Sequence, residues 1–236
     1  MCSLELVNIS PNNYYKNSIN VFSVHSLGIT MTTLKLTYFD VDGGRAEPIR
    51  LALHHAGMTF EDYRFSYNDF PQERQQTPLG QVPTLAIDDV TITQSNAILR
   101  YVGKQAELYP RDSYQALICD EVMDAADDCI NKITATFFLA DELIKEAREK
   151  LVNTDLTKYL TFIESKLIAQ GGEYFAEQRL SIADLKIMPI IGWLNSGMLE
   201  HVPTDLVASV APALNKHAQR VLTSKGVAEY YANRQR

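Results

Sequence analysis

Residues 34–50 read LKLTYFDVDGGRAEPIR, and this stretch decides how the first domain is built. Residues 34–38 alternate apolar and polar side chains, which predicts a short β-strand with Tyr38 at its end. A two-glycine loop follows, and a helix is expected over residues 45–56, because Gly57 stands where helices commonly end. The stretch therefore predicts a strand, a loop and a helix, with a phenol at the strand tip beside the N-terminus of the helix.

The chain then continues as an α/β domain. The expected elements are, in order, a strand, an irregular polar segment, two strands joined by a turn, and a helix: 60–65, 66–77, 84–87, 90–93 and 95–106. Asp88 and Asp89 form the two-residue turn, and Ser95 caps the helix. The order β-α-β, irregular segment, β-β-α predicts a thioredoxin-like domain over residues 33–110.

Pro83 precedes the third expected strand, where thioredoxin-like folds carry a cis proline. We expect a cis Val82–Pro83 bond, which leaves the backbone N–H and C=O of Val82 to pair with an extended peptide ligand. A trans proline at a strand start is the alternative. Disulfide exchange, the usual chemistry of such domains, needs a low-pKa cysteine at the first strand-to-helix turn. Residues 38–43 contain no cysteine, so a reactive sulfur must come from the ligand.

After residue 112 no strand signal returns, which predicts an all-helical domain over residues 113–236. Helices are expected over 113–147, 154–170, 181–197, 206–223 and, as a short last element, 225–232. Ser181 and Asp184 form an S-x-x-D pair before an apolar run, typical of a capping box at a helix start.

Composition limits the partners. The 236 residues carry a net charge of −7, with 46% apolar and 22% charged residues, which argues for a folded protein and against nucleic acid or anionic membranes as partners. No apolar stretch is long enough for a transmembrane helix. Cys2, Cys119 and Cys129 form no CxxC and no disulfide framework, so we expect a cytoplasmic protein. Residues 1–32 match no targeting signal, and we interpret them as a disordered or spurious N-terminal extension.

Six short motifs, in one order and spacing, give the chain a family resemblance. They are KLTYF (35–39), GRAE (44–47), DFP (69–71), PLGQVP (78–83), QSNAI (94–98) and SIAD (181–184). From Thr33 to Arg236 the sequence resembles the cytosolic glutathione transferases, most closely the sigma class, which includes prostaglandin D synthases. The resemblance implies a thioredoxin-like glutathione-binding domain, a helical domain that binds the electrophile, and no cofactor besides glutathione as co-substrate.

The resemblance also implies roles for individual residues. Tyr38 donates a hydrogen bond to the glutathione sulfur, and Arg45 supports the thiolate; a solvated Arg45 paired with Glu47 is the alternative. The other residues implied to bind glutathione are Phe39, Phe70, Arg74, Gln81, Val82, Pro83, Gln94 and Ser95. Phe70 stands where sigma members usually have tryptophan, which removes an indole donor. Arg74 stands in place of lysine and keeps a cation for the glycyl carboxylate.

Asp124, Asp127 and Asp128 fall on one helix face by their spacing, so a cation is expected near them. The family implies that Asp128 reaches the ammonium of the glutathione bound by the partner subunit of a homodimer. It also implies a possible Mg²⁺ or Ca²⁺ site in this cluster. A solvated acidic face is the alternative.

The electrophile pocket is the least specified part of the site. We expect it to be lined by Phe39, Ile130, Thr134, Phe138, Tyr230 and Tyr231. Ala135 stands near the position where prostaglandin D synthases carry a pocket tryptophan, which weakens an isomerase function. Conjugation of glutathione to electrophiles is therefore the first hypothesis, a glutathione-dependent isomerase of prostaglandin type the second, and a non-catalytic ligand-binding relative the third.

Overall fold

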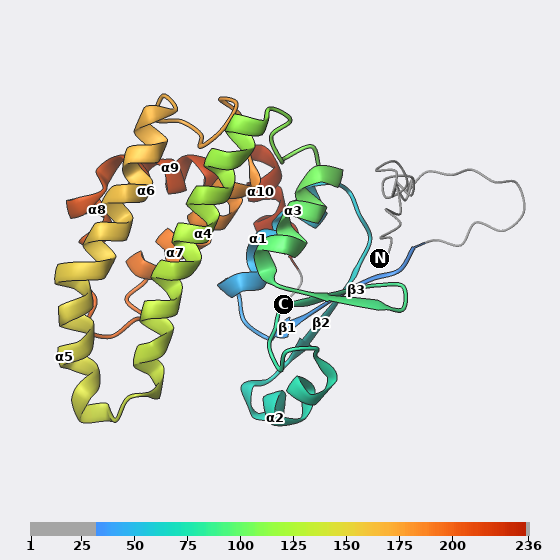
Figure 1. The fold of residues 1–236 in the computed structure, drawn as a ribbon, viewed down its shortest axis with the longest axis horizontal. Helices are drawn as coiled ribbons and strands as arrows, with labels where there is room; N and C mark the ends of the chain where they lie inside the picture. Colours follow the sequence, from blue (N-terminus) through green and yellow to red (C-terminus); the bar gives the residue numbers. More distant parts are fainter. Residues whose placement is uncertain (1–31, 235–236) are drawn as a thin grey trace, which may run out of the picture.

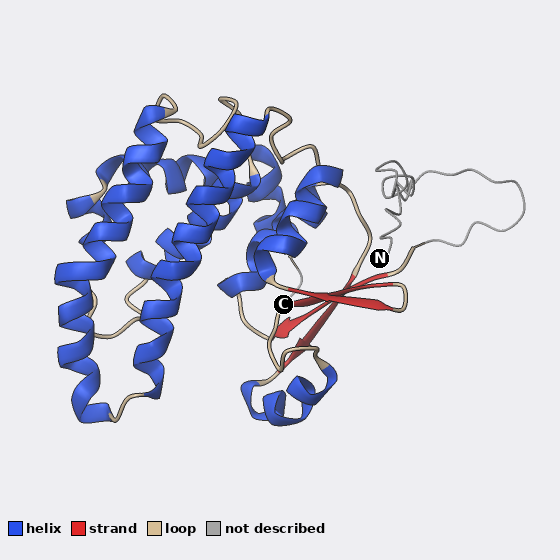
Figure 2. Ribbon diagram, in the orientation of Figure 1, coloured by secondary structure: helices blue, strands red, loops and turns tan. Residues whose placement is uncertain are grey.

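The computed structural model describes residues 32–234, which form an α/β part followed by a helical part (Figure 1). Strands occur only in the α/β part of this range (Figure 2). The strands are β1 (Leu34–Phe39), β2 (Glu61–Phe65), β3 (Thr84–Ile87) and β4 (Val90–Thr93). The first helices are α1 (Glu47–His55), α2 (Phe70–Glu73) and α3 (Ser95–Gln105). The interpretation of residues 1–32 lies, apart from Thr32, outside the described range.

The strands form one mixed sheet in the order β2-β1-β3-β4. β1 pairs parallel with β2 and antiparallel with β3, and β3 pairs antiparallel with β4. This β-α-β, β-β-α order confirms the predicted thioredoxin-like domain. The segment predicted to be irregular contains α2 and two single turns of 3-10 helix, at Tyr67–Asp69 and Arg74–Gln76.

Burial along β1 alternates with the pleat of the strand. Leu34, Leu36 and Tyr38 are buried, whereas the residues between them are half-buried. Figure 1 shows α1 and α3 together on one side of the sheet and α2 on the other. Because Tyr38 has the same strand parity as Leu36, its ring belongs to the buried row of β1.

The helical domain begins with α4 (Ser113–Ala135), α5 (Asp141–Leu151) and α6 (Thr157–Ala169). The single helix predicted over 113–147 is therefore wrong. A 3-10 turn (Thr136–Phe138) and the extended Leu139 and Ala140 interrupt it, and α5 restarts with two acids in its first turn, where the helix dipole favours them. The gap predicted before residue 154 is instead bridged by a π-helical turn, Val152–Leu156.

The remaining helices are α7 (Ile182–Asn195), α8 (Leu206–Val210), α9 (Pro212–Thr223) and α10 (Lys225–Asn233). The predicted helix 206–223 is divided at Ala211, because Pro212 begins a new helix at its first position. The capping box that opens α7 is confirmed: the Asp184 carboxylate accepts the Ser181 backbone N–H at 2.7 Å and the Ser181 hydroxyl at 2.6 Å.

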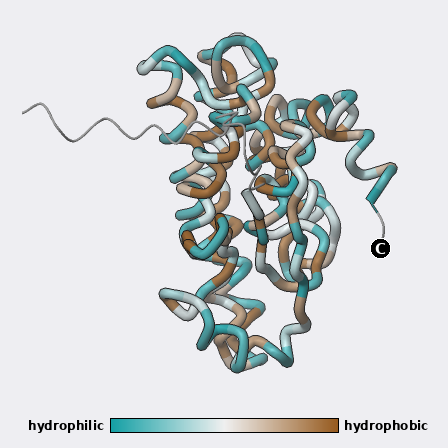
Figure 3. Tube along the Cα trace, turned by 90° about the vertical axis from the view of Figure 1, so that its right-hand side faces the viewer, coloured by the Kyte–Doolittle hydropathy of each residue, from teal (hydrophilic) through white to brown (hydrophobic). Residues whose placement is uncertain are grey.

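Both domains share one hydrophobic core, which includes Leu53 and Val102 from the first domain and Ile182 and Met188 from the second. Along the helices, hydrophobic and hydrophilic residues alternate, as expected for elements with one buried face (Figure 3). No helix of the described range is long and apolar enough to cross a membrane.

The two domains approach each other closely at a glycine. A Cβ at Gly103 of α3 would lie 2.4 Å from Cγ2 of Ile182 in α7, closer than any real contact. We expect Gly103→Ala to lower the free energy of unfolding by about 1–3 kcal/mol, because overpacking outweighs the gain in helix propensity. Urea unfolding measures the change.

Gly192→Ala is the matched control. Gly192 lies inside α7, is exposed, and a Cβ there meets nothing within 4 Å. We expect this variant to stabilise the protein by about 0.5–1 kcal/mol, because only the helix propensity changes. Equal effects of the two substitutions would contradict a close contact between α3 and α7.

Candidate functional site

The strand register brings three predicted site residues together at one end of the strands, which we call the sheet edge. Thr37 of β1 lies opposite Thr84 of β3, and Thr84 lies opposite Thr93 of β4. β3 runs antiparallel to β1 and to β4. The residues that follow Thr37 in β1 and Thr93 in β4 therefore lie next to the residue that precedes Thr84 in β3. These residues are Tyr38, Pro83 and Gln94. The Val82–Pro83 bond is cis, as predicted, with Gln81 exposed beside it.

Tyr38 is built as a hydrogen-bond donor. Its ring is buried, and its hydroxyl oxygen accepts the backbone N–H of Arg45 at 3.1 Å. Burial raises the pKa of Tyr38 above its ordinary value, against the opposing effect of the Arg45 N–H. The hydroxyl therefore stays protonated at neutral pH, and since its oxygen is the acceptor toward Arg45, its hydrogen can be donated to a ligand.

The N-terminus of α3 supplies the second part of the site. Gln94 precedes the helix with φ 74° and ψ 105°, a strained conformation for a residue with a side chain, and Gln94 is exposed. Ser95, which was predicted to cap this helix, is instead its first residue and is buried, and Gln94 occupies the cap position. The first N–H groups of a helix lack intrahelical acceptors and favour an anion, so this end of α3 can receive a carboxylate.

An aromatic cluster flanks the sheet edge. The ring of Phe39 stacks on Tyr67 at 4.4 Å between centroids and meets Tyr38 and Phe70 edge-on at 5.3 and 5.0 Å. The guanidinium of Arg74 lies 5.3 Å from the centre of the Phe70 ring. The predicted residues Phe39, Phe70 and Arg74 thus lie in one group. Tyr67 was not predicted, because it falls in the segment interpreted as irregular.

The side chain of Arg45 points away from the sheet, toward the helical domain. Its two terminal nitrogens donate to Asp127 Oδ1 at 2.7 Å and to Asn131 Oδ1 at 2.8 Å, both on α4. Lys186 of α7 donates to the same Asp127 oxygen at 2.9 Å and to Asn96 Oδ1 at 2.6 Å. The alternative partner expected for Arg45, Glu47, instead pairs with Arg50 and Arg234.

Two of the three aspartates of the expected cluster already have partners within the protein. Asp124 accepts from Asn96 at 2.7 Å and from Arg100 at 3.3 Å, whereas Asp128 is exposed. Among residues 32–234, no group of three or more His, Cys, Asp and Glu side chains converges as a metal site. The metal cluster expected at Asp124, Asp127 and Asp128 is therefore not formed, because protein cations and amides already contact the first two carboxylates.

The residues expected to line an electrophile pocket are spread over several surroundings. Ile130 is half-buried, and Thr134 donates to its backbone oxygen at 2.9 Å, one helical turn along α4 from the Arg45 contacts. Phe138 is 85% exposed at the end of α4. Tyr230 is buried against His54 of α1, and its neighbour Tyr231 packs on it. Tyr230 therefore belongs to the core of the molecule.

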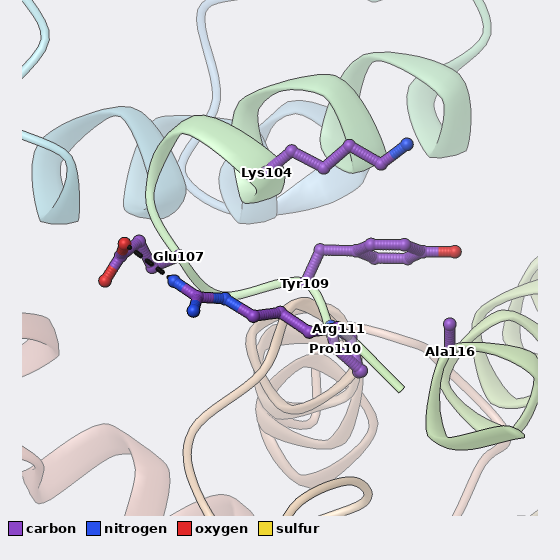
Figure 4. Close-up of a pocket in the computed structure, with 6 residues that line it drawn as sticks. All are labelled: Lys104, Glu107, Tyr109, Pro110, Arg111 and Ala116. Carbon is purple, nitrogen blue, oxygen red and sulfur yellow. Dashed lines mark hydrogen bonds and ion pairs between the residues drawn. The ribbon is translucent and has the colours of Figure 1, made fainter. Parts of the chain in front are cut away.

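A separate hollow of about 430 Å³ lies at the opposite end of α3 from Ser95. It is lined by Lys104, Glu107, Tyr109, Pro110, Arg111 and Ala116 (Figure 4). In it Arg111 pairs with Glu107 at 3.1 Å, and the Lys104 ammonium lies 5.3 Å from the centre of the Tyr109 ring. None of the predicted site residues lines it.

Comparisons with known proteins agree with this geometry. A family model described as "Glutathione S-transferase, N-terminal domain" matches residues 34–104, and one described as "Glutathione S-transferase, C-terminal domain" matches residues 127–234. Glutathione S-transferase 1 of Ascaris suum is 33% identical over 161 residues, which cover 66% of this chain and 78% of that protein. The chain belongs to the glutathione S-transferase family.

Solved structures relate this transferase to the sigma class. A prostaglandin synthase D of Nilaparvata lugens superposes with a TM-score of 0.75 at 29% identity, over 86% of this chain and 99% of that one. A sigma-class transferase of Fasciola hepatica gives a TM-score of 0.74 at 25% identity, over 87% and 98%. The sigma-like resemblance predicted from the sequence is therefore confirmed.

Sequence reasoning missed the side chains that surround Arg45 in this transferase. Asn96 and Asn131 carry no pattern of their own, and only the fold brings them to the same place. Lys186 did leave a signal, because it is a lone cation in the apolar run 185–194 of α7. A buried lysine needs a charged or polar partner, and such a run therefore points to a partner elsewhere in the chain.

Gly44 fixes the position of the Tyr38 hydroxyl. It has φ +66°, and a Cβ there would lie 2.7 Å from the Tyr38 oxygen. We expect Gly44→Ala to lose about 1–2 kcal/mol of stability from the positive φ and, in addition, to displace the phenol, which should reduce the rate of glutathione conjugation at least about tenfold.

Gly43→Ala is the control for backbone strain alone. Gly43 also has a positive φ, of +95°, but a Cβ there meets nothing within 4 Å. Both variants should lose stability in urea unfolding, and only Gly44→Ala should lose most of its activity. Full activity of Gly44→Ala would show that the hydroxyl position is not set by this contact.

Proposed function

We propose that this chain conjugates glutathione to small hydrophobic electrophiles, and that Tyr38 activates the glutathione thiol as a thiolate. The observation that carries the proposal is the state of the Tyr38 hydroxyl. Burial keeps the hydroxyl protonated, and its oxygen accepts the Arg45 N–H. Tyr38 lies at the sheet edge beside Pro83 and the N-terminus of α3. A hydrogen-bond donor held in this way can stabilise a negative charge that forms on a ligand atom in front of it.

The chemistry requires this donor because a free thiol is mostly protonated at neutral pH. A thiol with a pKa of about 8.5 is only a few per cent thiolate at pH 7. If the site lowers that pKa by about two units, the thiolate is stabilised relative to the thiol by roughly 2.7 kcal/mol. Any further acceleration comes from holding the electrophile next to the sulfur.

The remaining residues are proposed to hold the ends of the tripeptide. The N-terminus of α3, with Gln94 and Ser95, binds the γ-glutamyl carboxylate. Gln81 and the backbone of Val82 bind the peptide part. Arg74, which lies beside the Phe70 ring, binds the glycyl carboxylate. The electrophile is proposed to enter along α4 beside Asn131, which the Arg45 guanidinium contacts and near which Ile130 and Thr134 lie.

A second candidate is glutathione-dependent isomerisation of prostaglandin-type endoperoxides. It is favoured by the likeness to the prostaglandin synthase D of Nilaparvata lugens and disfavoured by the small Ala135 at the expected pocket position. Incubation with glutathione and either an aryl halide or an endoperoxide separates the two functions: conjugation consumes glutathione, whereas isomerisation leaves it unchanged.

Assembly and compartment are also part of the proposal. We propose a cytoplasmic homodimer that joins across α3 and α4, where Tyr114 and Leu117 expose apolar surface. Cys119 and Cys129 are free and buried, and burial raises the pKa of each thiol to about 12, which suits a reducing compartment and keeps both thiols unreactive.

Tyr38→Phe tests the proposed mechanism. The substitution deletes one oxygen and keeps the packed ring, so the fold and most of the glutathione affinity should remain. A hydrogen bond to an ionised acceptor contributes roughly 1.5–3 kcal/mol, or about one to two pKa units of the bound thiol. Conjugation at neutral pH should fall about ten- to hundredfold, and the loss should shrink as the pH approaches about 9, where the thiol ionises unaided.

The measurement is the ultraviolet absorbance of bound thiolate as a function of pH. Tyr109→Phe is the matched control, because it removes a hydroxyl that donates to Asp120 at 3.0 Å, away from the sheet edge. It should titrate like the wild type. Superimposable titrations of Tyr38→Phe and the wild type would mean that another group activates the thiol.

The dimer makes a separate prediction through Asp128. If this exposed carboxylate binds the ammonium of the partner subunit's glutathione, Asp128→Asn should weaken glutathione binding roughly two- to fivefold, the range for an exposed ion pair of up to about 1 kcal/mol. Glu146→Gln, an exposed acid on α5, is the control and should bind as tightly as the wild type. A monomer in light scattering with full glutathione affinity would exclude the shared site.

A further inference from the structure

Lys186 is a buried cation that the proposed mechanism has not used. Its side chain is only 5% exposed, and it lies two residues after Asp184, in the otherwise apolar run 185–194 of α7. Burial lowers the pKa of the Lys186 ammonium, and Asp127 opposes that shift. Burying a lysine lowers the stability of the fold unless its charge is paired, so the partners of Lys186 indicate what its charge does.

The contacts of Lys186 lead directly to the proposed active site. Its ammonium and one Arg45 nitrogen donate to the same oxygen, Asp127 Oδ1, at 2.9 and 2.7 Å. Arg45 in turn donates its backbone N–H to the Tyr38 hydroxyl. The Asp127 carboxylate therefore accepts hydrogen bonds from two cations, Arg45 of the first domain and Lys186 of the second. Arg45 connects this pair of contacts to Tyr38.

The charges of Arg45, Asp127 and Lys186 do not cancel. Among these three side chains, Arg45 and Lys186 contribute two positive charges and Asp127 one negative charge, so one positive charge remains in the group. Around these three side chains, Arg100 pairs with Asp120 at 2.7 Å and with Asp124 at 3.3 Å, and Asp128 is exposed. On the other side of Tyr38, Arg50 lies 5.8 Å from the centre of the ring and is paired with Glu47 and Asp62. Without Lys186, the Arg45–Asp127 pair would be neutral, and a neutral pair stabilises a nearby anion much less than a cation does.

We propose that Lys186 is a positioning residue that neutralises Asp127 from the helical domain and so keeps the charge of Arg45 available to the glutathione thiolate. The inference rests on the proposed function and extends it, because it assigns part of thiol activation to a residue of the second domain. Asn96 fixes the lysine from the side by accepting its second hydrogen bond at 2.6 Å.

Two variants test this by changing the net charge of the group formed by Arg45, Asp127 and Lys186. Lys186→Met removes one positive charge and should raise the pKa of the bound glutathione thiol by about one unit, with a tenfold smaller thiolate population at a pH below that pKa. The double variant Lys186→Met with Asp127→Asn removes one charge of each sign and leaves Arg45 as the remaining positive charge. Its thiol pKa should return close to the wild-type value.

The double variant also separates charge from packing. A residue with only a structural role would make the double variant at least as defective as the single one, and would leave the thiol titration of both unchanged. If Lys186→Met does not fold, the double variant, which also removes the Asp127 charge, still gives the titration. Lys166→Met is the control, since Lys166 pairs with Glu121 at 2.8 Å on the outer side of α4.

The outcomes distinguish this inference from the function on which it rests. A wild-type protein that does not lower the thiol pKa of bound glutathione overturns both. A wild-type protein that lowers it, with Tyr38→Phe raising it again but Lys186→Met unchanged, overturns only the role of Lys186. A double variant whose thiol pKa stays as high as that of Lys186→Met also overturns it.

Discussion

The arrangement of the helical domain depends on one buried carboxylate. Asp184 accepts hydrogen bonds from the Ser181 backbone and hydroxyl, from the Phe175 N–H at 3.1 Å, and contacts His217 Nε2 at 2.7 Å. An unpaired carboxylate in this fully buried place would cost several kcal/mol, so the four groups have to converge together. Their convergence sets where α7 begins, and α7 packs against α1, α4 and α9.

The position of α7 also determines where Lys186 lies at the boundary between the two domains. Lys186 follows Asp184 by two residues, and from this position it contacts Asp127 of α4, which holds Arg45 of the first domain. The proposed active site therefore depends on the docking of the two domains as well as on the thioredoxin-like fold. This explains why the interface combines a shared apolar core, which stabilises the docking, with a few buried polar contacts, which fix its register.

The binding edge of the first domain has a different origin. It is produced by the strand register, which brings Tyr38, Pro83 and Gln94 to one end of the sheet, and by local backbone conformations that side chains rarely adopt. Gly44 permits a close approach to the Tyr38 oxygen, and Gln94 keeps a positive φ at the start of α3. Strain of this kind persists where the surrounding structure holds it, and such places are often ligand sites.

The sequence by itself determined the order of elements, the capping box at Ser181 and the residues of the sheet edge, because turns, caps and alternation are local and the motifs keep their spacing. It did not determine the break at Leu139, where three apolar residues continue a helical pattern although the chain turns. Nor did it determine the cations around Asp127. Lys186 is 59 positions from Asp127 along the chain, and only packing of α7 on α4 brings the two charges into contact. Tertiary structure decided this part of the site, because the free energy of a buried charge depends on its neighbours in space.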